Sequence, residues 1–380
     1  MSDPGVPPAT PDNAPEGGPP ADVPMWLLGV VFAVILALAG VFVVALTHNG
    51  SSGAEAADPP APSYPLEWDS RIAPYATIAE DLRDLDFEHP VEVRFLPPDK
   101  FEKTVTSDKK KLDGEDRTEI EQFTGLMRAF GLITGDVDLF AAVNDFQAAG
   151  ILAYYSFDDK TITIRGNRLT PSVRSTLVHE LTHALQDQHF NVSSRMKHLR
   201  KESDDGTDTS EASVLRAIVE GDAERVQTLY RESLTPKQRA ALDAGQDDES
   251  AHANRTIKDI PKFVVTLFTS PYTLGQALVA AASADGGNAS VNELFTDSPT
   301  HESALLDPFR VLAADTDSRK VAVPPLQTGE KKFDSGEFGV LTWYLMLAER
   351  LPLKEALTAA DGWGGDAYRC SAGPCLPRRS

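Results

Sequence analysis

The sequence predicts an α+β domain that follows an N-terminal transmembrane helix. Three features lead to this fold class. Residues 25–46 form an uncharged apolar run, residues 151–156 and 161–164 resemble the two strands of a hairpin, and several segments space their apolar residues as helices do. The chain has 380 residues, 41% hydrophobic and 24% charged, which is ordinary for a globular domain with appendages.

The first 65 residues are predicted to contain a tail, a membrane span and a linker. Residues 1–24 are rich in Pro, Gly and Ala and lack Lys and Arg, which is typical of a disordered segment. The run 25–46 has 46 − 24 = 22 residues. A helix of this length crosses the roughly 30 Å hydrocarbon core of a bilayer. Residues 47–65 are rich in Ala, Pro, Gly and Ser and predict a flexible linker.

A cleaved signal peptide is the alternative for the apolar run, but it usually has a basic start and a shorter apolar stretch, and neither is present. The positive-inside rule does not set the orientation of the span, because no Lys or Arg precedes Arg71. A short tail before the span and a large domain after it favour a single-pass protein of the cell membrane. We therefore expect the domain to face the extracytoplasmic side.

The folded domain is expected to occupy residues 66–380. We expect strands at 91–96, 151–156 and 161–164 and helices at 78–87, 118–130, 137–146, 170–189, 210–234, 338–350 and 353–360. The helix at 170–189 has the clearest start, since Thr170 suits its N-cap and Pro171 its first turn. A small mixed sheet should lie on one side of this helix and a mainly helical part on the other.

Charge and cysteine content restrict the partners of the domain. The formal net charge of −21 argues against nucleic acid as a partner, because phosphate backbones are bound by clustered Lys and Arg. Cys370 and Cys375 are the only cysteines. They are too few for a zinc site of their own, and they either close a small disulfide loop, which would fit an oxidising compartment, or stay reduced.

The predicted helix at 170–189 carries the motif His-Glu-x-x-His, with His179, Glu180 and His183 at its fixed positions. Residues i and i+4 of a helix lie on one face, so both imidazoles can reach one zinc ion. Glu180 follows the first histidine and points beside the metal. It can therefore act as a general base toward a zinc-activated water.

A catalytic zinc site needs a third protein ligand, and two residues compete for this role. Glu220 lies on the next long helix, where Gly221 would allow a close approach to the metal helix and Glu224 could hydrogen-bond a ligand histidine. His189 fits the spacing His-Glu-x-x-His-x-x-Gly-x-x-His, but Gln186 stands where that pattern requires Gly. The helix should then continue and carry His189 off the metal-facing side.

The segment around the His-Glu-x-x-His motif and the segment around Glu220 resemble the gluzincin branch of the zincin metallopeptidases, and in particular poorly characterised bacterial membrane-anchored members. The resemblance is sharp only in residues 179–188 and 219–223 and weaker at 271–276 and 362–366. It implies a zincin-like metallopeptidase domain with Zn²⁺ as cofactor and His179, His183 and Glu220 as the metal ligands. Glu224 stands where thermolysin-like enzymes carry an Asp beside a ligand histidine.

The expected activity is hydrolysis of a peptide or protein substrate, with Glu180 taking a proton from water and passing it to the leaving amine. The transition-state oxyanion needs a second electrophile, for which the sequence offers four candidates. These are Tyr230, Tyr272, His301 and Tyr368. The alternative function is a catalytically silent zinc-binding surface domain that binds a partner. The presence of Glu180 argues against it, because binding zinc alone does not require that carboxylate.

Overall fold

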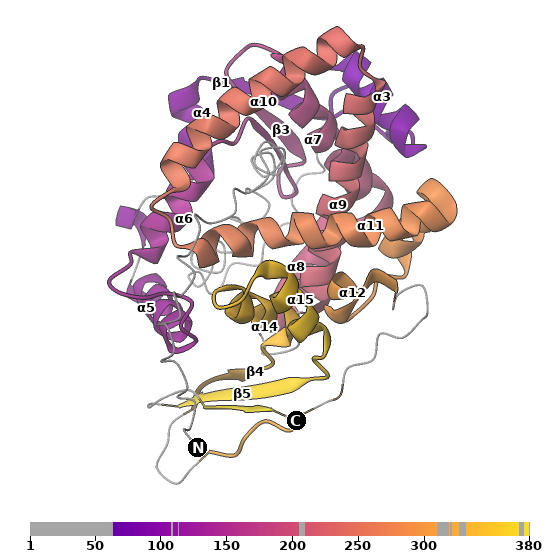
Figure 1. Ribbon diagram of the computed structural model, residues 1–380. Coiled ribbons are helices and arrows are strands. Elements are labelled where there is room, and N and C mark those ends of the chain that lie inside the picture. Colours follow the sequence, from indigo (N-terminus) through magenta and orange to yellow (C-terminus); the bar gives the residue numbers. More distant parts are fainter. Residues whose placement is uncertain are drawn as a thin grey trace, which may run out of the picture.

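The computed structural model describes residues 64–379, apart from 108, 113, 205–209, 310–318, 320, 327–331 and 372–375. This part of the chain is a mixture of helices and a few short strands, consistent with the predicted α+β class (Figure 1). The expected tail at 1–24 and transmembrane helix at 25–46 lie outside the described residues. So do Cys375 and all but the last two residues of the expected linker at 47–65.

The N-terminal part of the described chain builds a small sheet with helices around it. Its elements are α3 (Ala73–Arg83), β1 (Glu92–Leu96), α4 (Pro98–Val105), the 3-10 helix η1 (Lys109–Lys111), α5 (Gly114–Ala129), α6 (Leu139–Ala148), β2 (Ala153–Ser156) and β3 (Thr161–Arg165). The strand order is β1-β3-β2, in which β1 is parallel and β2 antiparallel to β3. The predicted hairpin is confirmed, and β2 forms one edge of this mixed sheet.

The first helix differs from the predicted range 78–87 at both ends. Pro74 lies in the first turn of α3, where its missing N–H group has no helical partner to lose. Asp84 then ends the helix in the left-handed conformation with φ of 56°. Both features are local turn chemistry, which the spacing of apolar residues does not report.

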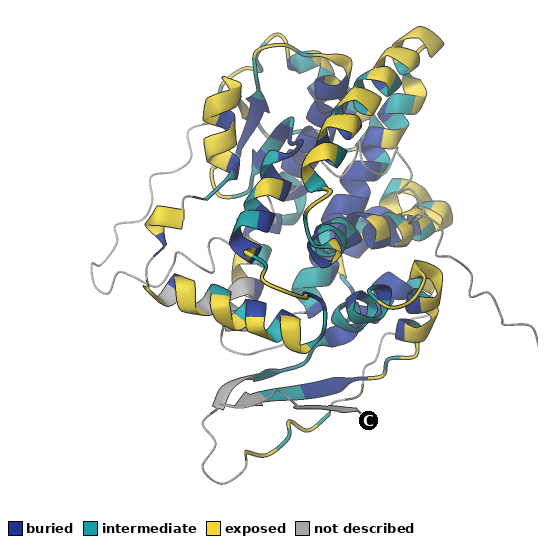
Figure 2. Ribbon diagram, turned by 60° about the vertical axis from the view of Figure 1, so that its left-hand side comes forward, coloured by how far each residue is buried: buried dark blue, intermediate teal, exposed yellow. Residues whose placement is uncertain are grey.

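The helix with the His-Glu-x-x-His motif is α7 (Pro171–Phe190), and it begins as predicted. The Thr170 side chain accepts a hydrogen bond from the N–H of Val173, and Asn191 ends the helix with φ of 52°. As expected, one side packs on the sheet through Val173, Leu177, Leu181 and Leu185. The other sides are buried too, so α7 runs through the interior of the protein (Figure 2).

Four helices follow α7 (Figure 1). The first three contact α7, and the fourth packs mainly against the second. They are α8 (Val192–Asp204), α9 (Ser210–Ser233), α10 (Pro236–Ile257) and α11 (Lys262–Thr296). The predicted helix at 210–234 is confirmed by α9, which packs against both α7 and α11. We expected Gly221 to bring α9 close to α7, but its α-carbon faces α11 instead.

Among the described residues, α11 is the single helix long and apolar enough to cross a membrane by length and composition. More than half of its most apolar window, 56%, is buried inside the protein. It carries Pro271 inside and a kink at Gly286 and Gly287. Its burial against α9 fits a core helix.

The C-terminal part adds short helices and a second small sheet. Its elements are α12 (Ser303–Leu306), β4 (Lys332–Gly336), α14 (Gly339–Ala348), α15 (Leu353–Asp361), β5 (Asp366–Ser371) and β6 (Leu376–Arg379). The predicted helices at 338–350 and 353–360 are confirmed, whereas the antiparallel sheet β4-β5-β6 was not predicted. Asp366 is buried and accepts hydrogen bonds from the indole N–H groups of Trp343 and Trp363.

Candidate metal centre

Two histidines of α7 and one glutamate of α9 meet in the interior of the protein. The Nε2 atoms of His179 and His183 lie 3.7 and 3.4 Å from Oε2 of Glu220. One ligand atom from each residue lies within 4.8 Å of the other two. The i, i+4 spacing places both rings on one face of α7, and α9 supplies the carboxylate from the facing helix. The three residues are close enough to bind one metal ion.

The burial and the unpaired atoms of this triad fit a cation. His179 and Glu220 are 0% exposed and His183 is 1% exposed. Within the described part of the chain, both Nε2 atoms and both carboxylate oxygens of Glu220 lack a hydrogen-bond partner. Buried polar atoms are normally satisfied, and leaving several of them unpaired in one place is costly. A metal ion bound between them would satisfy the imidazole nitrogens and the carboxylate together.

The charges of the triad point the same way. Burial lowers the pKa of His179 to about 4. Burial acts on His183 as well, but the neighbouring Glu220 carboxylate outweighs it and raises the pKa of His183 to about 9. Against its own burial, Glu220 has a pKa below the usual range because His183 lies beside it. The buried carboxylate of Glu220 thus favours a positive charge beside it.

Each histidine is oriented by a glutamine through its second ring nitrogen. Nδ1 of His179 lies 3.1 Å from Oε1 of Gln227, whose Nε2 donates to the hydroxyl oxygen of Ser175. Nδ1 of His183 lies 3.0 Å from Oε1 of Gln186. With an acceptor at each Nδ1, the neutral form of each ring carries its proton there, which leaves Nε2, beside Glu220, free to bind a metal ion.

Glu180 lies beside the triad with half of its carboxylate free. Oε2 accepts a hydrogen bond of 2.7 Å from the backbone N–H of Tyr155 in β2. Oε1 has no hydrogen-bond partner among the described residues. Burial raises the pKa of Glu180 well above its usual range, while the charge of His183 and the Tyr155 N–H act in the opposite direction. A carboxyl group with a raised pKa and one free oxygen is suited to accept and release a proton.

The structure assigns different places to the competing candidates. His189 lies outside the cluster at the end of α7, where its Nε2 is 2.8 Å from the carbonyl oxygen of Asp86. Glu224 is buried one turn after Glu220, but Nδ1 of His179 and Nδ1 of His183 lie against glutamine oxygens, so the expected contact of Glu224 with a histidine was wrong. Burial and the charge of Glu220 raise the pKa of Glu224 to about 8.

Among the four candidate electrophiles, Tyr272 on α11 is buried beside the cluster. It is 2% exposed, and its hydroxyl lacks a hydrogen-bond partner in the described structure. Burial raises the pKa of Tyr272 well above its usual range, and the charges of Glu220, Glu180 and Glu224 raise it further. Tyr230 instead packs edge-on against Tyr75, and Tyr368 stacks on Phe338 in the C-terminal sheet.

The residues around the triad that the sequence did not indicate are mainly amides. Gln186 follows His183 by three positions, which is one helical turn, and Gln227 follows Glu220 by seven, which is two turns. Helical spacing alone could have suggested both as neighbours of the site. The backbone contact of Tyr155 had no signal in the sequence. Comparisons of this chain with protein-family models, with curated proteins and with solved structures found no match.

Proposed function

We propose that the chain is a membrane-anchored zinc peptidase of the zincin class, similar to gluzincins. His179, His183 and Glu220 are its metal ligands, and the observation that carries the proposal is their buried triad of unpaired donor atoms. Two imidazoles and one carboxylate form a ligand set typical of catalytic zinc, which keeps a fourth position for water or substrate. When bound, zinc supplies Lewis-acid chemistry and lowers the pKa of a water molecule that it binds.

Glu180 is the general base of the proposed reaction. The Tyr155 N–H fixes one of its oxygens, so the other is held beside the triad in a single orientation. In that position the carboxylate accepts a proton from the attacking water and returns it to the amine of the leaving group. A site that only binds metal has no need for this buried carboxylate, and its presence therefore favours an enzyme.

Tyr272 is the proposed electrophile for the oxyanion. Its hydroxyl lies among the carboxylates of the cluster and is without a partner in the described structure, so it has a hydrogen bond to donate. A preorganised donor in a site that excludes water stabilises the charge that develops on the carbonyl oxygen. Burial keeps the phenol protonated, which this role requires.

The proposed substrate is a peptide or protein segment in extended conformation. β2 is an edge strand of the described sheet, and the backbone N–H of Tyr155 donates to Glu180, which lies beside the triad. An edge strand can pair with an extended peptide through those of its backbone groups that remain unpaired. The apolar run at 25–46 supports anchoring in the cell membrane with the domain on the extracytoplasmic side.

Metal analysis and a peptide-library digest of the purified full chain test this proposal. We expect about one zinc ion per chain and cleavage of peptides, with Glu180→Gln retaining zinc and losing cleavage. Glu302→Gln is a matched control, because Glu302 is also a buried carboxylate. It accepts a hydrogen bond from the backbone N–H of Leu341 and is not part of the triad. Stoichiometric zinc without cleavage of any peptide would instead support the silent zinc-binding domain.

A further inference from the structure

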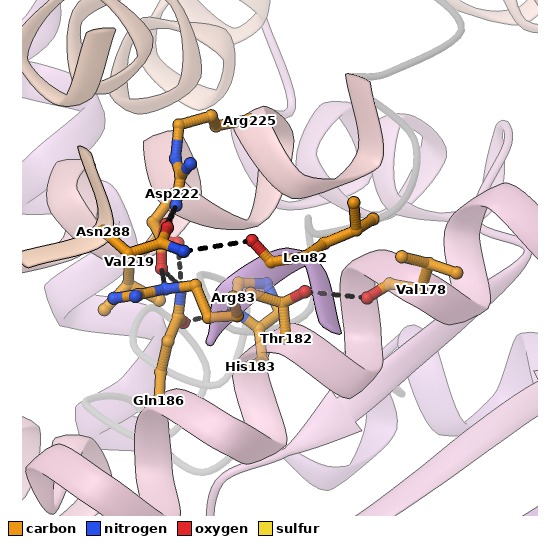
Figure 3. A network of polar contacts seen from close by, with 10 residues as sticks. All are labelled: Leu82, Arg83, Val178, Thr182, His183, Gln186, Val219, Asp222, Arg225 and Asn288. Carbon is orange, nitrogen blue, oxygen red and sulfur yellow. Dashed lines mark hydrogen bonds and ion pairs between the residues drawn. The ribbon is translucent and has the colours of Figure 1, made fainter. Parts of the chain in front are cut away.

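Gln186 connects the metal centre to a buried ion pair that the proposed mechanism does not use (Figure 3). Its side-chain oxygen lies 3.0 Å from Nδ1 of His183. Its side-chain nitrogen donates two hydrogen bonds of 3.0 Å, one to the carbonyl oxygen of Val219 and one to Oδ2 of Asp222. Gln186 is 0% exposed, so water does not replace any of these partners.

These contacts determine which way the amide of Gln186 points. A flipped amide would direct its oxygen at two acceptors, the Val219 carbonyl and the Asp222 carboxylate, and would leave no donor for either. The oxygen of Gln186 must therefore face His183. The neutral ring of His183 then carries its proton on Nδ1, which leaves Nε2, beside Glu220, free to bind a metal ion.

The carboxylate of Asp222 is itself held by two cations. Nε of Arg83, on α3, lies 2.8 Å from Oδ2 of Asp222, and both side chains are 0% exposed. Arg225 donates from its terminal nitrogen to Oδ1 of Asp222 at 3.1 Å and also to Asn288. Asn288 in turn donates to the carbonyl oxygen of Leu82, next to Arg83. The acceptor used by Gln186 is thus a charged oxygen in a fixed position.

We propose that Arg83 and Asp222 are positioning residues for the metal centre, which act on His183 through Gln186. The inference rests on the proposed function, because it concerns the metal affinity of the same site. Arg83 carries the effect over a sequence separation of 139 residues, from a helix outside the two that supply the ligands. A buried ion pair could simply join α3 to α9, but that role does not explain why its acceptor oxygen also fixes the amide of Gln186.

A double-mutant cycle on zinc affinity separates these two roles. In the full chain, zinc affinity is measured by competition with a chelator for Asp222→Asn, Gln186→Met and the double variant. Loss of an outer contact to a ligand histidine typically weakens metal binding about 10–100-fold, and we expect both single variants to fall near this range. Because Asp222 acts through Gln186, adding Asp222→Asn to Gln186→Met should change the affinity less than about twofold.

Asp366→Asn is the matched control. Asp366 is also a buried carboxylate with three hydrogen bonds, to the backbone of Phe338 and to two indoles, but it lies in the C-terminal sheet. It should destabilise the fold without changing zinc affinity. As a second readout, the visible spectrum of the cobalt-substituted chain should shift in Asp222→Asn and stay unchanged in Asp366→Asn, since the spectrum reports the geometry of the ligands.

Arg83 offers an independent variant pair in case Asp222→Asn does not fold. Arg83→Lys keeps the cation beside Asp222, whereas Arg83→Met keeps only the length of the side chain. If Arg83 acts on His183 through Asp222 and Gln186, a relay of contacts, zinc should bind more tightly to Arg83→Lys than to Arg83→Met. Equal affinities in this pair, additive losses in the cycle, or an equal loss in Asp366→Asn would each overturn the relay while leaving the peptidase proposal standing. A wild-type chain that binds no zinc would overturn both.

Discussion

Gly221 of α9 lies directly against Gly275 of α11, and neither position has room for a β-carbon. A β-carbon on Gly275 would lie 1.8 Å from the carbonyl oxygen of Ala217, and one on Gly221 would lie 2.3 Å from the backbone of Gly275. The two helix backbones are therefore in direct contact. This crossing lies next to Glu220 on one helix and one turn from Tyr272 on the other, so it sets the distance between the two side chains.

We predict that Gly275→Ala separates α9 and α11 and destabilises the protein. Overpacking of a tight interior typically costs about 1–3 kcal/mol, and a backbone obstruction on a rigid helix should reach at least that range. Chemical denaturation measures the effect. Gly125→Ala is the control, because Gly125 lies in α5 with nothing within 4 Å of an added β-carbon. That change should stabilise the helix by roughly 0.5–1 kcal/mol. Equal stability of Gly275→Ala and the wild type would contradict the crossing.

The zinc affinities of Glu220→Ala and His189→Ala decide which of the two residues is the third metal ligand. Glu220→Ala should weaken zinc binding by more than the roughly 100-fold that loss of an outer contact causes, because a direct ligand is removed. His189→Ala should bind zinc like the wild type, since its ring nitrogen contacts the Asp86 carbonyl at the end of α7. Isothermal titration with zinc compares the two. Loss of zinc affinity in His189→Ala alone would show that His189, and not Glu220, is the third ligand.

Gln227 should contribute to zinc affinity through the role that the sequence suggested for Glu224, a hydrogen bond to the second ring nitrogen of a histidine. Its oxygen is the acceptor at Nδ1 of His179, so Gln227→Met should weaken zinc binding about 10–100-fold. Ser175→Ala removes only the hydroxyl that orients this amide and should have a smaller effect. The same zinc titration measures both variants. A larger loss in Ser175→Ala than in Gln227→Met would show that the amide is not the contact that matters.

Tyr272→Phe should lower kcat while leaving zinc content and KM close to those of the wild type. Removing one oxyanion donor typically costs about 10²–10³ in kcat, because the hydrogen bond is made only in the transition state. Steady-state kinetics on any peptide that the wild type cleaves provides the measurement. Tyr230→Phe is the control, as its ring packs against Tyr75 instead of the cluster. Full activity in Tyr272→Phe would remove this residue from the mechanism.

Protease treatment of intact cells tests the predicted membrane anchor. If residues 25–46 remain uncleaved and the domain faces outward, added protease should release a soluble fragment that begins within 47–65. Mass spectrometry of the released fragment gives its first residue. A domain that is protected until the cells are lysed would indicate the opposite orientation. Recovery of the intact domain in the medium without protease would indicate a cleaved signal peptide.

The sequence alone determined the elements that depend on local chemistry. Thr170, Pro171 and an apolar face were sufficient to predict α7, and the i, i+4 spacing then placed His179 and His183 on one side of it. The hairpin of β2 and β3 and the helix α9 followed from alternation and helical spacing in the same way. Such features arise within one or two turns of the chain, where neighbouring residues decide the conformation.

Three parts of the structure were harder to predict from sequence. The helix α11 is interrupted by Pro271 and a Gly286–Gly287 kink, and its apolar residues follow no clear amphipathic period. Turn chemistry at Pro74 and Asp84 likewise moved α3 away from its predicted range. The second sheet consists of short strands that the periodicity does not distinguish from loops.

Only the tertiary structure decided which side chains of α9 meet the two histidines. Glu220 and Glu224 lie one turn apart on α9, and the angle at which α9 crosses α7 and α11 directs Glu220 at the histidines and Gln227 at Nδ1 of His179. Gly221 faces α11 for the same reason. The contact from Arg83 to Asp222 joins positions 139 residues apart. Partners at such separations are set by how helices pack, which no local pattern along the chain encodes.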